Sequence, residues 1–474
     1  NSASTTANSK NTFKVEAINR SNTNISLESV EILPLNTRID SIISLKQNIA
    51  NSLTLSGEIP SEIRQTSPYW LREKGSIGMY RVSEKNLIGL PETPRVIIAI
   101  FKVSFNGVVI PIAKNVVYKY NDPVKGEVYK PFEILPKVTA SFNEKVFIFA
   151  NDDPQKINVK VKAIKENLSG TVALDIPEFW RVSQKSFSFN LKEKDEEQNF
   201  EFEVKPPSKA AEIFIKPTVQ IGDKKFTNEL VEIDYNHIPF QSVIRPSETK
   251  LVRLAIQKKG QIIGYIHGAG DAVPTALRQM GYMVVELNED DITPEKLENF
   301  DTIVLGIRLY NISDKAKFYQ KFLHSYVENG GTLIVQYNTN RGLKVEEVAP
   351  FPLKLSNNRV TEEDAEVRMI NPDHELLNFP NKITNKDFEG WVQERGLYFP
   401  SEWDSKFETI LSMNDKNETP ENSSLLVAKY GKGNFIYTGL SFFRELPAGV
   451  SGAYKLFANM VSIGKNNTKK PLKN

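Results

Sequence analysis

A glycine-containing loop after a short apolar run is the first place in this sequence where binding chemistry is conceivable. The segment 263–282 reads IGYIHGAGDAVPTALRQMGY, in which Gly268 and Gly270 precede Asp271. A loop of this kind between a strand and a helix often binds phosphate through its backbone N–H groups. The dinucleotide fingerprint, however, requires glycine where Val273 stands, and the carboxylate of Asp271 would repel a pyrophosphate. We therefore predict that the glycines serve a tight turn and that Asp271 caps the helix.

The second candidate is the segment Asn371–Glu375, NPDHE, which resembles the His-Pro-Asp-Asp-Glu zinc signature of certain sugar deacetylases. Its first position is asparagine instead of histidine, and its fourth is histidine instead of aspartate. A zinc site needs about three protein ligands, and the other histidines, His237, His267 and His324, lack metal-ligand spacing. We predict no metal and no cofactor in this chain, and a proline-initiated turn at NPDHE.

Nucleophilic catalysis has no obvious residue to perform it. Cysteine is absent, and no G-x-S-x-G sequence provides a serine on a nucleophile elbow. In amidotransferase-like α/β domains the nucleophile follows a central strand, and here the predicted strand 332–336 is followed by Tyr337 and Asn338. Neither side chain is a nucleophile without an activating base. We therefore predict no catalytic residue in this chain.

What remains is a crevice at the carboxyl ends of predicted parallel strands, where open α/β sheets bind their ligands. Charged side chains with aromatic neighbours fall in the loops at these ends, and this combination suits a polar ligand such as a sugar. The predicted ligand-binding residues are His267, Asp271, Arg308, Tyr310, Asn338, Trp391, Glu394, Arg395 and Arg444. The alternative is structural: the arginines and glutamate pair with each other, and Trp391 seals the edge of the core.

The elements that must position these residues alternate between strands and helices after residue 251. The predicted strands are 262–266, 283–287, 302–306 and 332–335. A predicted helix over 313–328 carries an apolar stripe made of Phe318, Phe322, Leu323 and Tyr326. Alternating strands and helices imply a parallel sheet that is covered by helices on both faces.

The first half of the chain has a period of two instead, which is typical of half-buried strands. Asn106-Gly107 between two apolar runs predicts a type I′ hairpin, because both turn positions need positive φ. The predicted fold is a multidomain β plus α/β protein, with two β-sandwiches followed by a three-layer α/β domain of the flavodoxin or class I amidotransferase type. The predicted parts are a sandwich over 1–137, a sandwich over 138–236, a linker over 237–250 and the α/β domain over 251–466.

Composition narrows the classes of partner. The 474 residues include 60 basic and 58 acidic side chains, a net charge of +2, so no field of one sign recruits nucleic acid. No apolar run approaches the roughly 20 residues that cross a bilayer, so we predict no membrane span. The absence of cysteine excludes disulfides and thiolate metal sites.

Several stretches together carry a family resemblance. They include SPYWLREKGSIGMY, YKYNDPVKGEVYKP, GYIHGAGDAVPTALRQMGY, FEGWVQERGLYFPSEWD and GKGNFIYTGLSFFRELPAGVSGAYKLFANM. On these stretches the chain resembles the C-terminal region of large bacterial PIG-L (LmbE-like) family deacetylases. In that family a zinc-dependent N-acetyl-sugar deacetylase domain precedes β-sandwich modules and an amidotransferase-like domain. The segment DIPEFWRVSQKSFSF also resembles the NEW3 type of sandwich, which accompanies many glycan-active enzymes.

The resemblance implies an accessory role. The family's zinc ligands belong to a domain that would precede residue 1, so zinc is expected there and no catalytic residue carries over to this chain. We expect a secreted or periplasmic protein whose partners are that deacetylase domain and a glycan or amino-sugar ligand. The alternative is that the α/β domain itself is a sugar-binding sensor or hydrolase that acts through His267, Asp271 and Glu394. A purely structural role in bridging domains or subunits is a third possibility.

Overall fold

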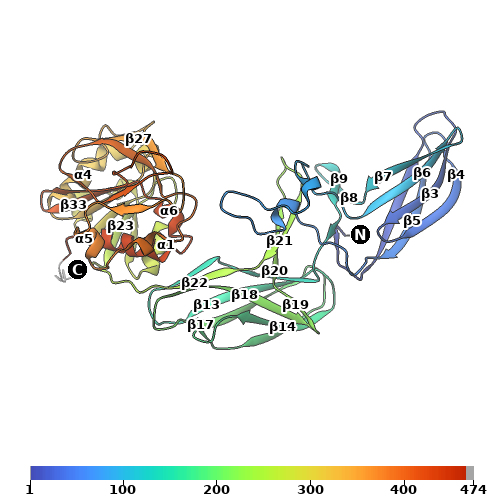
Figure 1. The fold of residues 1–474 in the computed structure, drawn as a ribbon, viewed down its shortest axis with the longest axis horizontal. Coiled ribbons are helices and arrows are strands. Elements are labelled where there is room, and N and C mark those ends of the chain that lie inside the picture. Colours follow the sequence, from blue (N-terminus) through green and yellow to red (C-terminus); the bar gives the residue numbers. More distant parts are fainter. Residues whose placement is uncertain (1, 466–474) are drawn as a thin grey trace. The chain divides into compact units, whose positions relative to one another are not determined.

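The computed structural model describes residues 2–465 of the protein (Figure 1). Residues 1 and 466, the outer limits of the predicted domains, lie outside this range. The chain is mostly β, with 44% strand and 13% helix, and its strands form several separate sheets. It divides into two compact units, one comprising 1–144, 155–204 and 214–249, and the other comprising 145–154, 205–213 and 250–474. The predicted second sandwich therefore contributes segments to both units.

The N-terminal part of the first unit is built around the antiparallel sheet β4-β3-β6-β7 and the pair β2-β5. Asn106 and Gly107 join β6 to β7 with φ angles of 47° and 80°, which confirms the predicted type I′ hairpin. The strands of this part are β1 (Ser4–Thr5), β2 (Lys10–Ile18), β3 (Ile25–Leu33), β4 (Thr37–Ser44), β5 (Ala50–Glu58), β6 (Ile98–Phe105), β7 (Val108–Asn115), β8 (Val117–Asp122), β9 (Gly126–Pro131) and β10 (Glu133–Ile134), with short 3-10 helices η1 (Tyr69–Leu71) and η2 (Lys85–Leu87).

The next strands form a four-stranded sheet, β11-β13-β17-β15, and a group in which β14 pairs with both β16 and β18. Alternate residues of β13, from Ile157 to Ala163, are fully buried, as period-two patterning requires. These strands are β11 (Val138–Phe142), β12 (Val146–Phe149), β13 (Gln155–Ala163), β14 (Leu168–Asp175), β15 (Arg181–Val182), β16 (Ser186–Leu191), β17 (Glu197–Lys205), β18 (Ala211–Ile221), β19 (Lys224–Phe226), β20 (Asn228–Ile233), β21 (Gln241–Pro246) and β22 (Thr249–Arg253).

The stretch 237–250, predicted as a linker, is structured. It contains all of β21, which pairs with β20 along its whole length, and the first residues of β22. Its prolines flank the strand instead of interrupting it: Pro239 precedes β21 and Pro246 ends it. Proline is tolerated at such positions because a strand end does not need its backbone N–H. The linker prediction is therefore corrected.

The larger part of the second unit contains a seven-stranded sheet in the order β24-β23-β25-β26-β33-β32-β30. The first five strands are parallel, and β32 and β30 continue the sheet in antiparallel fashion. These strands are β23 (Ile262–Ile266), β24 (Met283–Leu287), β25 (Thr302–Leu305), β26 (Thr332–Gln336), β30 (Phe407–Thr409), β32 (Leu425–Tyr430) and β33 (Gly433–Thr438). The pairs β27 (Leu353–Val360) with β29 (Gly396–Trp403), and β28 (Val367–Met369) with β31 (Leu411–Met413), lie outside this sheet.

Helices pack on the two faces of the sheet through separate hydrophobic clusters. Val304 of β25 packs in one cluster with α1 (Val273–Gln279) and α7 (Ser451–Ser462). Its neighbour Leu305 packs in the other with α2 (Pro294–Leu297) and α4 (Ala316–Glu328). Because successive strand residues point to opposite faces, each strand supplies both clusters. The remaining helices are η3 (Glu289–Asp291), α3 (Leu309–Ile312), α5 (Glu375–Asn378), η4 (Asn385–Phe388) and α6 (Phe442–Glu445).

The apolar stripe of α4 differs from the prediction. Phe318 is 65% exposed, whereas Tyr319, Leu323 and Tyr326 are buried. Residues at positions i, i+4 and i+7 lie on one face of a helix, and Tyr319 starts this series. The hydroxyl of Tyr319 hid the correct face: Tyr319 looks polar in the sequence, but it is buried and its hydroxyl donates to the Glu289 carboxylate at 2.6 Å.

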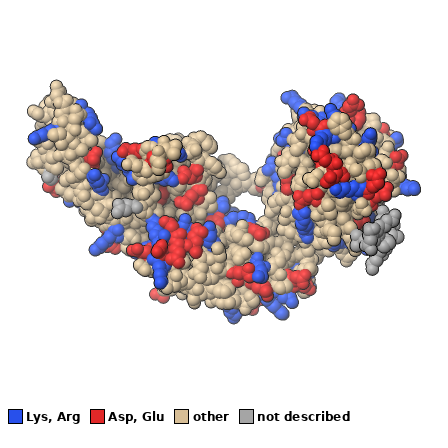
Figure 2. Space-filling model, turned by 180° about the vertical axis from the view of Figure 1, so that it is seen from behind, with Lys and Arg blue, Asp and Glu red and all other residues tan. Residues whose placement is uncertain are grey.

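The surface carries charges of both signs. Figure 2 shows basic and acidic side chains interspersed over the face in view, in keeping with the net charge of +2. Within residues 2–465, no helix combines the length and apolar character needed to cross a bilayer.

Candidate functional site

The loop after β23 is held by Asp271, one of the predicted ligand-binding residues. Oδ1 of Asp271 accepts hydrogen bonds from the hydroxyl of Tyr265 at 2.6 Å and from the N–H of Val273 at 2.9 Å. Oδ2 accepts from the N–H of Ile307 at 3.1 Å, so the carboxylate ties the loop after β23 to the loop after β25. Burial and the nearby Asp271 carboxylate raise the pKa of the Tyr265 hydroxyl, which therefore stays protonated and donates. Asp271 thus stabilises the loop from the residue before the assigned N-cap, Ala272.

Gly268 has a packing role in the same loop. A Cβ atom at this position would lie 2.0 Å from the carbonyl oxygen of Ile307. Only glycine allows the backbones of the two loops to approach so closely. Gly270 adopts a φ of 104°, which side chains rarely tolerate. Both glycines therefore serve the turn, which is what we predicted for them.

His267 lies in a different environment. Its Nε2 is 2.6 Å from the Glu286 carboxylate, which also pairs with Arg278 at 2.6 Å. Hydrogen bonds from Arg278, and then from His267, lower the pKa of Glu286. His267 borders an open, polar cleft of about 420 Å³, whose other lining residues include the acidic run 289–291. No group of three or more potential metal ligands occurs within the described part of the chain.

Tyr310 and Asn338 are interior residues. The side chain of Tyr310 lies in the hydrophobic cluster beneath α4, and burial raises the pKa of its hydroxyl. Asn338 is 1% exposed; its Oδ1 accepts from the N–H of Tyr310 at 2.9 Å and its Nδ2 donates to the carbonyl of Gln336 at 3.0 Å. The two residues join the loops after β25 and β26 and present no polar atom toward a ligand.

Trp391 and Arg395 are also buried, at 3% and 5% exposure. The indole Nε1 of Trp391 donates to the carbonyl of Asp387 at 3.1 Å, and the guanidinium of Arg395 donates to the carbonyls of Ala365 and Phe388. Desolvation lowers the pKa of Arg395. These contacts fix the segment that precedes β29, and they match the structural alternative for Trp391.

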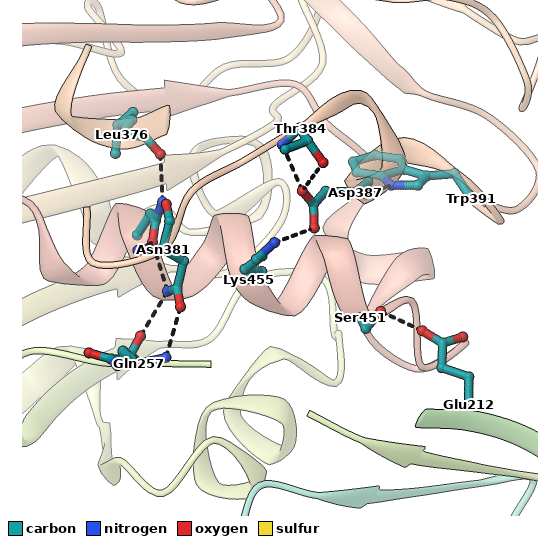
Figure 3. A network of polar contacts seen from close by, with 10 residues as sticks. Glu212, Gln257, Leu376, Asn381, Thr384, Asp387, Trp391, Ser451 and Lys455 are labelled. Carbon is teal, nitrogen blue, oxygen red and sulfur yellow. Dashed lines mark hydrogen bonds and ion pairs between the residues drawn. The ribbon is translucent and has the colours of Figure 1, made fainter. Parts of the chain in front are cut away.

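Figure 3 shows how the same segment is anchored to α7. Asp387 accepts from Thr384 and pairs with Lys455 of α7 at 2.8 Å. The buried side chain of Asn459 donates to the carbonyls of Leu376 and Asn381, both at 2.8 Å. Because each buried amide has partners, this network specifies the path of the chain between α5 and β29.

Three aromatic rings gather at the carboxyl edge of the parallel strands. Tyr337, which follows β26, stacks on Tyr398 of β29 with ring centroids 6.0 Å apart and planes 8° from parallel. Phe443 of α6 packs against Tyr337 from another direction, at 5.1 Å. Tyr337 is almost buried, whereas Tyr398 and Phe443 are half-buried and present part of each ring to solvent. Ile307 and Leu397 complete the apolar floor.

Arginine side chains surround these rings. The guanidinium of Arg359 lies 5.5 Å from the ring centre of Tyr398, and that of Arg444 lies 4.9 Å from the ring centre of Phe443. The backbone N–H of Arg308 donates to the carbonyl of Tyr337 at 2.8 Å. Glu394 accepts from Arg444 at 2.8 Å, and the side chain of Gln393 accepts from the same guanidinium. We call this set the aromatic–arginine patch: Tyr337, Tyr398, Phe443, Arg308, Arg359, Arg444, Gln393 and Glu394.

Backbone strain is concentrated in the aromatic–arginine patch. Ten residues other than glycine have positive φ within residues 2–465, and seven of them are asparagine or aspartate, which tolerate this region. The other three are Arg308, Gln393 and Tyr398, with φ angles of 57°, 69° and 53°. All three belong to the patch. Strain of this kind persists where the surrounding structure over-determines it, and it clusters at functional sites.

A β-bulge places the Tyr398 side chain. Arg359 of β27 pairs with Leu397, and Asn358 pairs with Phe399, so Tyr398 is an extra residue without a partner in the β27-β29 ladder. Bulges redirect side chains that a regular strand would place elsewhere. Here the redirected side chain is the one that stacks on Tyr337.

The structure brings three of the nine predicted ligand-binding residues together in the patch: Arg308, Glu394 and Arg444. Five others, Asp271, Tyr310, Asn338, Trp391 and Arg395, make internal structural contacts, and His267 pairs with Glu286. Sequence reasoning did not select Tyr398, Phe443, Arg359 or Gln393, and it considered Tyr337 only as a nucleophile. The available signal was an aromatic residue within three positions of a charged one, in the stretches ERGLYFP and SFFRE, both of which contain residues that were selected.

The chemistry that the patch offers is recognition. Partly exposed rings flanked by guanidinium groups bind flat or ring-shaped polar molecules by stacking and by hydrogen bonds. The only carboxylate among the patch residues, Glu394, is paired with Arg444.

Comparison with known proteins gives no family assignment. No protein-family model matches the chain, and no curated protein matches it. Among solved structures, an exo-β-1,4-mannosidase from an Opitutaceae bacterium is 12% identical over 41% of this chain and 35% of its own, with a TM-score of 0.26. A Salmonella alpha-2-macroglobulin is 11% identical over 54% of this chain and 16% of its own, with a TM-score of 0.20. A Porphyromonas gingivalis protein of unknown function is 7% identical over 52% of this chain and 93% of its own, with a TM-score of 0.15. Similarities at this level carry no argument about fold class or function.

Proposed function

We propose that this protein is a non-catalytic, glycan-recognising accessory region of a secreted or periplasmic zinc-dependent N-acetyl-sugar deacetylase of the PIG-L (LmbE-like) family. The observation that carries the proposal is the aromatic–arginine patch, with its three strained residues Arg308, Gln393 and Tyr398. Sugar rings present apolar C–H faces and polar rims, and half-exposed aromatic rings beside hydrogen-bond donors match both features. The family assignment rests on the sequence stretches described above.

The proposal includes a finer description of the fold. The second unit is a three-layer α/β domain of the flavodoxin or class I amidotransferase type, and the strands before it form two β-sandwiches. The parallel order of the central strands and the separate helix clusters on the two faces support this description of the second unit. The patch lies beyond the carboxyl ends of these strands, which is where such domains bind their ligands.

The contacts of the predicted crevice favour the recognition role over a hydrolase. Asp271 is engaged by three intramolecular donors, and Glu394 is paired with Arg444. His267 is bonded to Glu286, and no hydrogen bond or ion pair within residues 2–465 joins His267 or Asp271 to Glu394. A general acid–base mechanism needs such groups within reach of one another.

The experiment that tests the proposal separates binding from turnover. The whole chain is titrated with tetra-N-acetylchitotetraose, called chitotetraose below, by isothermal calorimetry, and the same mixture is assayed for acetate with and without added zinc. We expect saturable binding in the micromolar to millimolar range and no acetate under either condition. Zinc-dependent release of acetate by this chain would refute the non-catalytic role, and an absence of binding to amino-sugar oligomers would refute glycan recognition.

A further inference from the structure

The guanidinium of Arg308 is the feature of the patch that its internal contacts leave unexplained. Its Nε is buried and has no hydrogen-bond partner. Within residues 2–465, no side chain or carbonyl forms a hydrogen bond or ion pair with this guanidinium. By contrast, the guanidinium of the nearby Arg395 donates to two backbone carbonyls. A buried donor without a partner carries an energetic cost, which a ligand relieves when it binds.

The backbone conformation of Arg308 is a second unfavourable feature of this residue. Arg308 has a φ of 57°, and its N–H donates to the carbonyl of Tyr337 at 2.8 Å. A left-handed conformation is unfavourable for a residue with a Cβ atom, because the Cβ crowds the following carbonyl oxygen. The short connection from β25 to α3 therefore fixes the backbone of Arg308 next to that of Tyr337, in a conformation that neither helix nor strand would give it.

The charges around the rings are unbalanced in favour of cations. The patch residues include three arginines, Arg308, Arg359 and Arg444, and one carboxylate, Glu394, which pairs with Arg444; the Glu363 carboxylate beside the patch accepts from the N–H of Gln393. The guanidinium of Arg359 is exposed and, within the described part of the chain, has no hydrogen-bonded or ionic partner. Burial raises the pKa of Tyr337, and the charged groups that also act on it are Arg308, Glu394 and Arg444. Two cationic groups are thus left for a ligand.

We infer that the aromatic–arginine patch takes an acidic sugar, one that bears a carboxylate, and that the guanidinium of Arg308 binds this carboxylate while Tyr398 and Phe443 contact the sugar rings. Arginine presents parallel N–H donors that match the two oxygens of a carboxylate. This inference rests on the proposed function, since it specifies the class of glycan that the same patch accepts.

The test compares two oligosaccharides that share an amino sugar and differ in charge. The whole chain is titrated with a hyaluronan tetrasaccharide, which alternates N-acetylglucosamine with glucuronate, and with neutral chitotetraose. We expect the acidic probe to bind about 10-fold or more tightly, because hydrogen bonds to charged groups contribute about 1.5–3 kcal/mol. The preference should shrink as salt rises from about 20 to about 300 mM, because the screening length shortens severalfold over this range.

Variants assign the effect to Arg308. Arg308→Gln should remove the preference for the acidic probe, so that the ratio of the two affinities falls from about 10 or more to about 1 in this variant. Arg278→Gln removes an exposed arginine of the same domain and should leave both affinities unchanged. If Arg308→Gln does not fold, Arg359→Gln serves in its place with a smaller expected loss of preference.

The outcomes distinguish this inference from the proposed function. Equal binding of the two probes to the unaltered chain, or a preference that persists in Arg308→Gln, would overturn the acidic-sugar inference and leave glycan recognition standing. Binding of neither probe would overturn both. Tighter binding of the acidic probe that depends on Arg308 and on salt would support both.

Discussion

The rings of Tyr337 and Tyr398 stack with their centroids 6.0 Å apart and their planes 8° from parallel. The two residues come from different structural contexts, a loop after a parallel strand and a bulge in an antiparallel ladder. A bulge residue with positive φ lowers the stability of the fold relative to a residue in a regular strand. The residue at this strained position is tyrosine, although glycine would be easier to accommodate, and the proposed glycan site gives a reason for the side chain.

Replacing Gln393 tests whether the backbone of the patch is strained by positive φ angles. Gln393 has a φ of 69°, and its side chain is exposed to solvent and contacts Arg444. Gln393→Gly should be more stable than Gln393→Ala by about 1 kcal/mol, because glycine has no Cβ penalty at positive φ. Thermal unfolding of the two variants, followed by circular dichroism, gives the comparison. Equal stability would mean that residue 393 is not held in this conformation.

Replacing Asp271 tests whether the carboxylate is structural. Asp271→Ala removes the acceptor for Tyr265, Val273 and Ile307, and we expect a loss of about 2–4 kcal/mol in stability. Tyr265→Phe removes one of these bonds and should cost about 1 kcal/mol. Neither variant that remains folded should lose glycan affinity. If the Asp271→Ala variant is as stable as the unaltered chain but has lost ligand binding or an activity, the result would support the alternative, in which the crevice acts as a sugar sensor or hydrolase through Asp271.

Gly268 provides a second test of the same loop. A Cβ atom at residue 268 would meet the carbonyl oxygen of Ile307 at 2.0 Å, a distance that the backbone must relieve by moving. We expect Gly268→Ala to destabilise the chain by about 2 kcal/mol or more. Gly342→Ala is the comparison without a steric clash: it places alanine at a φ of 70°, and a Cβ atom there would have no neighbouring atom within 4 Å. Comparable melting temperatures for the two variants would contradict the close packing of the loops.

The buried carboxyl of Glu445 makes stability depend on pH. Burial raises its pKa to about 8, although Val392 and Ser441 donate hydrogen bonds to it. The folded protein therefore binds this proton more tightly than the unfolded chain does. The stabilisation is fully present below the unfolded pKa of about 4.5 and is lost as pH rises through 8.

The variant Glu445→Gln isolates this effect. It should match the unaltered chain at pH 5 and exceed its stability at pH 9 by about 2–4 kcal/mol, since one pKa unit corresponds to about 1.4 kcal/mol. Glu402→Gln, at an exposed carboxylate, is the control and should show no such difference. The measurement is the melting temperature of each protein at the two pH values. If the Glu445→Gln variant and the unaltered chain lose the same stability between pH 5 and pH 9, the pH dependence does not come from Glu445.

The parallel strands were the most predictable part of the fold. The predicted bounds of β23 and β24 agree with the structure, those of β25 differ by one residue, and β26 has the longer of its two predicted ranges, 332–336. Strands buried on both faces are continuous apolar runs, and the turn residues at their ends mark where they stop. The apolar stripe of α4 was misplaced because Tyr319 looks polar in the sequence but is buried. The stretch 237–250 looked like a linker because its prolines mark the ends of a strand as readily as a loop.

The candidate site was predictable only in part. The rule that ligands bind at the carboxyl ends of parallel strands led to Arg308 and Arg444, and Glu394 was selected because its segment, 388–400, was expected to fold over the crevice. It did not lead to Tyr398, because a bulge in a separate strand pair brings that ring to the site, and a bulge has no sequence signal when its residue is not glycine. The sequence also did not show that Tyr310 and Trp391 are buried, because burial depends on packing between segments that are distant in sequence.

Calorimetric titration with chitotetraose of the unaltered chain, of Tyr398→Ala and of Phe318→Ala is the most direct test of glycan recognition by the patch. Tyr398 belongs to the aromatic–arginine patch, whereas Phe318 is an exposed aromatic residue on α4. We predict that Tyr398→Ala weakens binding by about 10-fold or more while Phe318→Ala leaves it unchanged, because only the first removes a ring from the site. Equal affinity of the unaltered chain and Tyr398→Ala, with both proteins folded, would contradict the account.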